Sequence, residues 1–471
     1  MKSPILTALV ALSLTAPAAR AEPPAGGRPE PQAGAPETSD KPPPPSIASF
    51  LGPQGDPGRS RSALEKAGVT YSLTYIGEIL GNASGGFRRG SIYEGRLDVQ
   101  LDADLEKLGG WQGATFHAQA FQIHGRGLSR YYLGNLMTVS GIEALPSTRL
   151  FELWLEQSFL AGKAALKAGQ LAADSEFLTS QYGALFVNAT FGWPAITGTN
   201  LPSGGPAYPL ATPGARLKLT PVEGFTLLAA AFNGDPAGPG PGDPQRNDRH
   251  GLEFRLRDPA FLIGEAQLAY NQGKDAAGLP GTVKVGAWHH LGRFDDQRFD
   301  PFGLSLADPA GTGLAARLRG NGGVYAMIDQ MLHRVPGTTD QGLGAFARVS
   351  ANPGDRNLID FYVDGGFTWK GLIPGRGDDT FGVGVGYARI SRDARALDRD
   401  TIAFTGTAMP VRSSEALIEV TYQAQVVPGW TVQPDFQYVF RPGGNVLNPR
   451  DPSGEAIRNA AIFGLRSTIR Y

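Results

Sequence analysis

The sequence predicts an all-β protein built as an antiparallel transmembrane β-barrel. Three observations carry this prediction: apolar and polar residues alternate with a period of two, the alternating segments end in aromatic residues, and short connections alternate with long ones. Residues 96–105 illustrate the first observation, because Leu97, Val99 and Leu101 share one face of a strand while charged and amide residues share the other. Such a strand separates an apolar surface from an aqueous one.

The composition excludes several classes of protein. The chain of 471 residues contains no cysteine, which excludes disulfides, thiolate zinc sites, iron–sulfur clusters and a cysteine nucleophile. Its formal net charge of −1 argues against a nucleic-acid partner, because proteins that bind nucleic acid carry a basic surface. Charged residues make up only 18% of the chain and 64 residues are glycine, a combination that indicates an all-β protein with many turns.

The N-terminal region divides into an export signal and a linker. A basic start, a short apolar run and a small-x-small cleavage sequence predict a signal peptide over residues 1–21. Residues 22–58 are rich in proline and glycine and are predicted to form a flexible lead-in, because they cannot bury enough apolar surface to offset the entropy of ordering. The barrel domain is predicted to span residues 59–471.

The location of the apolar face distinguishes two all-β architectures. In a soluble β-sandwich this face turns inward, whereas in a membrane barrel it turns toward lipid. Segments of about ten residues fit a tilted membrane strand, which needs ~9–11. Aromatic side chains near the segment ends match the girdles of a membrane barrel. These residues are Tyr71, Tyr75, Trp111, Trp154, Trp369, Trp430, Tyr438 and Phe440.

The final segment, residues 461–471, is an amphipathic strand. Phe463, Leu465, Ile469 and Tyr471 share one face, and the arginines share the other. A strand of this kind with a terminal aromatic residue resembles the assembly signal of bacterial outer-membrane barrels. The pattern therefore predicts the barrel-assembly machinery as a partner of this strand, and outer-membrane lipid and lipopolysaccharide as its surroundings.

The connections between strands are either tight or long. The long, irregular stretches are residues 125–148, 173–212, 292–321 and 392–412. Outer-membrane barrels alternate in this way, with short turns on the periplasmic side and long loops on the extracellular side. The pattern yields seventeen candidate strands, but bacterial single-chain barrels have an even number, so we expect sixteen and place the surplus near residues 250–280. A barrel of this size encloses an aqueous channel.

Several dispersed blocks of the chain resemble one known family, the carbohydrate-selective porins of the OprB family. The similarity runs from about residue 55 to the end. Its blocks are residues 108–111, 151–157, 167–171, 174–177, 322–330, 433–439 and 442–444. The resemblance implies a sixteen-stranded outer-membrane channel through which monosaccharides such as glucose diffuse, with no cofactor and with a charged constriction that contains arginine and glutamate.

The alternation of side chains along each predicted strand indicates which residues line this constriction. Sugars offer hydroxyl groups and apolar C–H faces, which arginine, carboxylates and aromatic rings bind. On the strand around residue 154, Phe151, Leu153 and Leu155 are predicted to face lipid. We expect the constriction to contain Arg96, Glu152, Trp154, Glu156 and Arg216, with Trp154 as an aromatic platform between two carboxylates. A further lumen-facing ladder is predicted at Glu253, Arg255 and Arg257. The alternative is that most of these charges form ion pairs across the wall, away from the solute path.

The sequence offers little support for an enzyme. Glu152 and Glu156 would lie about 13 Å apart on a strand, which exceeds the ~5–9.5 Å that glycosidase carboxylates require. The glycine series at residues 382–386 lacks the spacing of a nucleotide-binding loop. No catalytic residue, metal site or cofactor is therefore predicted.

Three functions remain open at this point. The first is a passive channel for small sugars, and the second is a general or anion-leaning porin on the same barrel. The third is a barrel enzyme or adhesin whose long loops carry the function. The resemblance favours the first.

Overall fold

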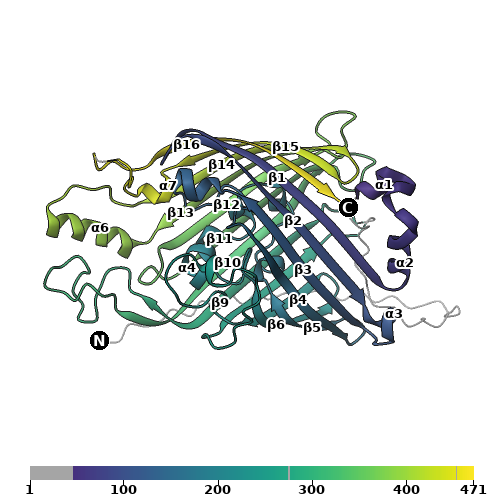
Figure 1. The fold of residues 1–471 in the computed structure, drawn as a ribbon, viewed down its shortest axis with the longest axis horizontal. Helices are drawn as coiled ribbons and strands as arrows, with labels where there is room; N and C mark the ends of the chain where they lie inside the picture. Colours follow the sequence, from purple (N-terminus) through teal and green to yellow (C-terminus); the bar gives the residue numbers. More distant parts are fainter. Residues whose placement is uncertain (1–45, 274–275, 452) are drawn as a thin grey trace, which may run out of the picture.

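β1 (Val69–Gly86) pairs with β16 (Arg458–Arg470), and this pairing closes the sheet into a barrel (Figure 1). The computed structural model describes residues 46–273, 276–451 and 453–471. Within these residues sixteen strands form one closed, antiparallel sheet in which each strand pairs with its neighbours in the sequence. The predicted fold class and strand number are confirmed.

The other strands follow in chain order: β2 (Gly90–Asp104), β3 (Ala114–Gly125), β4 (Ser147–Phe159), β5 (Ala164–Leu171), β6 (Thr212–Val222), β7 (Phe225–Phe232), β8 (Phe261–Tyr270), β9 (Gly281–Asp295), β10 (Arg317–Arg334), β11 (Gly342–Ala351), β12 (Ile359–Lys370), β13 (Thr380–Ile390), β14 (Ser414–Val427) and β15 (Trp430–Phe440). The α-helices are α1 (Ile47–Leu51), α2 (Ser60–Lys66), α3 (Leu105–Gly109), α4 (Ala195–Asn200), α5 (Pro244–Asn247), α6 (Arg392–Thr405) and α7 (Pro442–Asn445). No helix of the described ranges is long and apolar enough to cross a bilayer.

The longest connections gather at one end of the barrel. Tight turns such as 160–163, 223–224 and 428–429 occupy one end, which we call the turn end. The opposite end, the loop end, carries the long connections 126–146, 172–211, 233–260, 296–316 and 391–413. In Figure 1, α3 marks the turn end on the right, and α6 and α7 mark the loop end on the left.

Residues 252–257, one of the predicted strands, form no strand and belong instead to the connection 233–260. β7 and β8 pair with each other and with β6 and β9, so neither edge is open to a further strand. Arg255 turns back onto Asp258 at 2.7 Å. This segment is therefore the surplus candidate among the seventeen predicted strands. The prediction of a lumen-facing ladder at Glu253, Arg255 and Arg257 is wrong.

The alternation along each strand sorts side chains between the outer surface and the lumen. On β2, Val99 and Leu101 are exposed on the outer surface, whereas Asp98 is buried inside. On β16, Phe463 is exposed, whereas Arg466 turns inward and donates to Glu78 at 2.5 Å. The apolar face therefore points toward lipid and the polar face toward the lumen, as the sequence predicts.

A β-bulge in β4 changes one predicted orientation. Leu150 pairs with Ala120 and Leu153 pairs with Ala118, so two residues of β4 oppose one residue of β3. The extra residue turns the side chain of Phe151 inward. Phe151, predicted to face lipid, is buried against the rings of Phe121 and Tyr208, with centroid distances of 4.7 and 6.2 Å. That prediction is wrong, because alternation shifts phase at a bulge.

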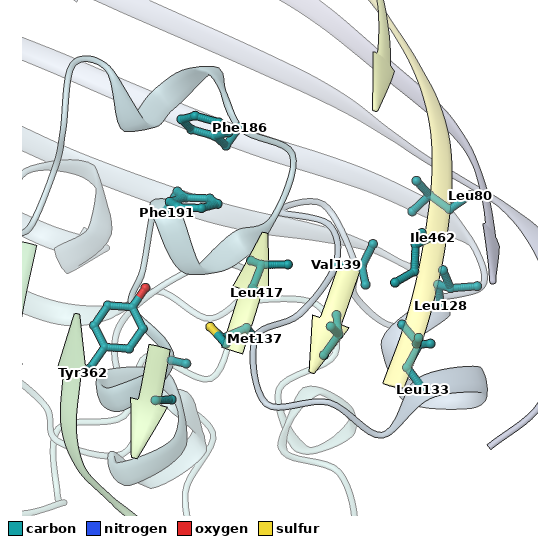
Figure 2. Packing of buried hydrophobic residues seen from close by; sticks show 14 of the residues in the cluster. Leu80, Leu128, Leu133, Met137, Val139, Phe186, Phe191, Tyr362, Leu417 and Ile462 are labelled. Atoms are coloured by element: carbon teal, nitrogen blue, oxygen red, sulfur yellow. The ribbon is translucent and has the colours of Figure 1, made fainter. Parts of the chain in front are cut away.

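Two of the long connections fold into the barrel and build an apolar core against its wall (Figure 2). The connection 172–211, which we call the inward loop, contributes Phe186 and Phe191, and the connection 126–146 contributes Leu128, Leu133, Met137 and Val139. The wall residues they contact include Leu80, Tyr362, Leu417 and Ile462. The lumen is thus partly filled by the molecule's own loops.

Charged and amide side chains of the wall hold the main chain of the inward loop. Arg348 of β11 donates to the carbonyl oxygens of Leu178 and Thr190, both at 2.7 Å. Glu419 of β14 accepts from the backbone nitrogens of Val187 and Asn188 at 2.6 and 3.0 Å. Because buried main-chain groups need partners, these bonds fix the inward loop inside the barrel.

The segment before β1 lies against the turn end. Residues 1–45, which include the predicted signal peptide and most of the predicted lead-in, lie outside the described residues. From Ser46 the chain forms α1, two 3₁₀ turns and α2. The Tyr471 hydroxyl donates to the carbonyl oxygen of Gly55 at 2.8 Å, and Arg61 lies 5.0 Å from the Tyr471 ring centroid. This segment therefore contacts the aromatic end of β16.

Candidate pore constriction

The five residues predicted for the constriction all lie on one side of the barrel wall. Arg96 is on β2, Glu152, Trp154 and Glu156 are on β4, and Arg216 is on β6. Their side chains point into the barrel. They nevertheless divide into four environments: Glu156 and Arg216 share one, and Trp154, Glu152 and Arg96 each have their own.

Glu156 and Arg216 form a charged row together with two residues that the sequence did not nominate, Lys167 and Glu176. Glu156 pairs with Lys167 of β5, and Lys167 pairs with Arg216. Arg216 Nη2 lies 2.5 Å from Glu156 Oε2, and Arg216 Nε lies 2.6 Å from Glu176 Oε2. Lys167 Nζ lies 2.5 Å from Glu176 Oε1. We call these four residues the charged row; two are cations and two are anions.

Glu176 joins the wall to the inward loop. It follows the short 3₁₀ turn Ala173–Ser175, so the loop itself presents this carboxylate to the two cations of the wall. Burial opposes ionisation of Glu176, but Lys167 and Arg216 outweigh it and hold the pKa of the carboxyl below its usual range. Glu176 is therefore ionised at neutral pH and ties the loop to the wall.

The carboxylates of the charged row reach water more than the cations do. The side chains of Glu156 and Glu176 are 25% and 21% exposed, whereas those of Lys167 and Arg216 are 12% and 5% exposed. The lumen therefore meets carboxylate oxygens first, with the guanidinium and ammonium groups behind them. Such oxygens accept hydrogen bonds from hydroxyl groups.

Trp154 lies between two polar neighbours of the wall. The ring of His117 stacks on the indole at a centroid distance of 4.7 Å and an interplanar angle of 15°. Lys167 Nζ lies 4.0 Å from the indole centroid. The indole nitrogen is buried and makes no hydrogen bond within the described residues. Trp154 thus forms a stack shared with His117 and Lys167 instead of the open platform that the sequence predicts.

His117 connects Trp154 to a water-facing carboxylate. Its Nδ1 lies 2.7 Å from Asp102 Oδ1, and the Asp102 side chain is 46% exposed. Asp102, His117 and Trp154 are consecutive cross-strand partners on β2, β3 and β4. This second row lies beside the charged row and adds another exposed acceptor to the lumen wall.

Glu152 has a different role from Glu156. It is buried, and its Oε1 accepts from the backbone nitrogen of Ala172 at 2.9 Å, where the inward loop leaves β5. Glu152 and Glu156 therefore differ in their surroundings: the first contacts the start of the loop, and the second faces the lumen.

Arg96 lies apart from the charged row, against aromatic rings. Its guanidinium carbon is 4.7 Å from the Phe121 centroid and 5.0 Å from the Tyr208 centroid. Its Nη2 lies 4.0 Å from Asp98 Oδ2. Tyr208 belongs to the inward loop and its hydroxyl donates to the carbonyl oxygen of Ile142 at 2.9 Å. Arg96 is thus held where two long connections meet the wall.

The inward loop also carries a perturbed carboxyl group. Asp174 accepts from the backbone nitrogen of Tyr208 at 2.9 Å. Burial raises the pKa of Asp174 to about 7, against the opposing effect of that hydrogen bond. Asp174 therefore titrates near neutral pH beside the loop residues that contact Arg96.

Sequence reasoning missed several residues of this region. Lys167 could have been predicted from the sequence, because pairing β4 with β5 places it opposite Glu156. Glu176 and Tyr208 carry no signal of alternation, since both lie in an irregular loop. Within the described residues, no group of three histidines and carboxylates is arranged to hold a metal ion.

The fold and this wall together define a class of protein. A closed sixteen-stranded barrel with a lipid-facing apolar surface, a polar lumen and a long loop folded into it is an outer-membrane porin. Residues 88–471 match the family of carbohydrate-selective porins, the OprB family. The chain belongs to this family, as its sequence blocks predict, and is a sugar-selective channel of the bacterial outer membrane.

Known proteins support this placement. The chain is 25% identical over 435 residues to Porin B of Pseudomonas aeruginosa, with 88% of this chain and 89% of the relative covered. Its structure is similar to the high-pH structure of Pseudomonas putida OprB, with a TM-score of 0.78, 23% identity, and coverage of 88% of this chain and 97% of the other. The low-pH structure of the same protein gives a TM-score of 0.53 at 17% identity, covering 91% and 99%.

Proposed function

We propose that this porin passes monosaccharides such as glucose, and that the charged row forms the narrow part of their path. One observation carries the proposal: Glu176 of the inward loop meets Arg216 and Lys167 of the wall, so the row lies where the loop approaches the wall. Arg96 and the Asp102–His117–Trp154 row extend this surface.

The chemistry of the row suits a neutral, hydroxyl-rich solute. Glu156 and Glu176 offer acceptors to sugar hydroxyls, while Arg216 and Lys167 fix those carboxylates and offset their charge. A row with equal numbers of cations and anions exerts little net attraction on ions of either sign. This balance favours a sugar channel over the anion-leaning porin. Weak, exchangeable hydrogen bonds also allow the solute to leave.

The residues have separate roles in this proposal. Glu156 and Glu176 contact the solute, and Arg96 supplies donors nearer the loop end. Glu152 is a positioning residue that acts through the start of the inward loop. Trp154 orients His117 and Lys167.

A liposome-swelling panel across monosaccharides tests the proposal. Glu156→Gln keeps the size of the side chain but removes the charge, so we expect it to change the ratios of sugar rates while the barrel stays folded. Glu106→Gln, on the exposed α3 at the turn end, is the matched control and is expected to leave the ratios unchanged. Unchanged ratios in Glu156→Gln would remove this residue from the path.

The anion-leaning alternative has its own test. Reversal potentials in a salt gradient report the ion preference of the open channel, and swelling rates for dicarboxylates report anionic solutes. A sugar channel with a balanced row is expected to show weak ion preference. A strong anion preference together with sugar-independent current would favour the alternative.

Two further assignments belong to this proposal. We expect the outer surface to contact outer-membrane lipid and lipopolysaccharide, and β16, ending at Tyr471, to engage the barrel-assembly machinery. Its outward aromatic and aliphatic residues support both. No enzymatic role is proposed, because the family is one of channels.

A further inference from the structure

A cavity lies at the loop end, lined by residues other than those of the charged row. Three long connections enclose it: residues 136–143, 189–210 and 243–245 each contribute a wall. Its volume is about 350 Å³, within the ~300–1,000 Å³ of small-molecule sites. We call it the vestibule cavity. A neighbouring space of about 570 Å³ shares Thr138, Glu143 and Gln245 with it.

Trp193 gives the vestibule cavity an aromatic surface. Its indole nitrogen donates to the carbonyl oxygen of Gly204 at 3.0 Å, which fixes the orientation of the ring. The side chain is half-buried and lines the cavity. Within the described residues, no aromatic ring or cation stacks on it, in contrast to Trp154.

Polar side chains also line the vestibule cavity. Within the described ranges, the hydroxyls of Thr138 and Thr199 make no hydrogen bond, although both residues line the cavity. Gln245 Oε1 accepts from the backbone nitrogen of Leu145 at 2.7 Å, which fixes the amide and leaves its nitrogen as a donor. The cavity thus offers a fixed aromatic ring with donors and acceptors around it.

We propose that the vestibule cavity binds one sugar ring at the loop end before the sugar reaches the constriction. A pyranose presents an apolar C–H face to an aromatic ring and hydroxyl groups at its rim, and this cavity provides partners for both. The proposal rests on the sugar specificity of the family and not on the assignment of the charged row.

The position of Tyr208 links this site to the constriction. Tyr208 lines the vestibule cavity, and Arg96 lies 5.0 Å from the centroid of its ring. Tyr208 therefore forms part of the wall between the vestibule cavity and Arg96. The site lies on one side of the constriction only, so it serves solutes that arrive from the loop end.

This asymmetry gives the proposal a direct test. Ion-current noise in a planar bilayer measures the association rate of D-glucose added to either side of the inserted channel. We expect Trp193→Leu to lower the association rate from the loop side at least threefold and to leave the rate from the turn side unchanged. Thr199→Val, which removes one hydroxyl at constant shape, is expected to act in the same direction with a smaller effect.

Two variants provide controls. Trp111→Leu makes the same exchange at an exposed residue of the turn end and is expected to leave both rates unchanged. Glu156→Gln alters the constriction and is expected to change the residence time of glucose from both sides equally. If the charged row does not form the constriction, Glu156→Gln will leave the residence time of glucose unchanged, and the result for Trp193→Leu will not be affected.

The outcomes decide the proposal. A loop-side loss in Trp193→Leu and Thr199→Val supports a sugar site in the vestibule cavity. Equal losses from both sides, or unchanged rates in both variants, overturn it and leave the cavity as a water-filled part of the entrance. Normal conductance and a folded, heat-modifiable band on electrophoresis show that each variant keeps its barrel.

Discussion

Replacement of Arg348 by methionine is expected to release the inward loop and to raise the ion conductance of the channel. The Arg348 side chain is 1% exposed and lies between Asp364 and the loop. Its guanidinium donates to the carbonyl oxygens of Leu178, Thr190 and Gly192 at 2.7, 2.7 and 3.0 Å. Methionine keeps the length and apolar stem of the side chain but offers no donor to these oxygens.

The size of the effect on loop docking follows from the burial of the Arg348–Asp364 ion pair. Removal of one partner of a buried ion pair costs about 3–5 kcal/mol, because the other charge stays buried without compensation. Each 1.4 kcal/mol is about a factor of ten in an equilibrium constant. The ratio of docked to released loop is therefore expected to fall by about a hundredfold or more. The double variant Arg348→Met/Asp364→Leu removes both charges and is expected to recover part of this loss.

Single-channel conductance and limited proteolysis of the inward loop measure the release. Arg317→Met is the matched control, because the Arg317–Asp295 pair is more than half exposed and surface pairs contribute only ~0–1 kcal/mol. If Arg348→Met shows the conductance and protease resistance of the unmodified channel, then the main-chain bonds of Arg348 do not hold the loop, and the reasoning fails.

Three further predictions concern the same loop and the last strand. Burial raises the pKa of Asp174 from the ordinary 3.8 to about 7 in the folded chain, so the stability of the fold is expected to fall as pH rises from about 4 to about 7. Thermal unfolding at pH 5 and pH 8 should show this difference in the unmodified chain but not in Asp174→Asn. Phe191→Ala, at a buried position, is expected to cost about 3–5 kcal/mol of loop packing, seen as greater proteolysis of the inward loop. Tyr471→Ala is expected to reduce the yield of folded barrel in the outer membrane, measured from the heat-modifiable band; an unchanged yield would contradict the assembly role of that residue.

Regular alternation made most of the barrel predictable. Each outward residue of β2 and β16 follows from a period of two, because a strand that separates lipid from water has no other way to place its side chains. The same rule failed at residues 252–257, where alternation exists without a free strand edge to pair with. It failed again at Phe151, because a bulge adds one residue and moves the phase without a mark in the sequence.

The constriction was predictable only where it lies on strands. Glu156 and Arg216 came together because both point into the lumen from strands that flank β5. Glu176 and Tyr208 approach the wall through the fold of a long loop, and such contacts between distant segments leave no local pattern. His117 and Lys167 lie on the strands that flank β4, so pairing of these strands could have placed both beside Trp154.

The inward loop is anchored through its main chain, so the anchoring and the solute preference depend on different parts of the loop. Arg348 binds carbonyl oxygens, which every residue type supplies. Glu419 binds backbone N–H groups, which every residue type except proline supplies. Side chains of the loop that face the lumen, apart from Glu176 with its ion pairs to the wall, are therefore exchangeable without loss of these anchors. The barrel acts as a fixed frame in which solute preference can be redesigned by substitutions in one loop.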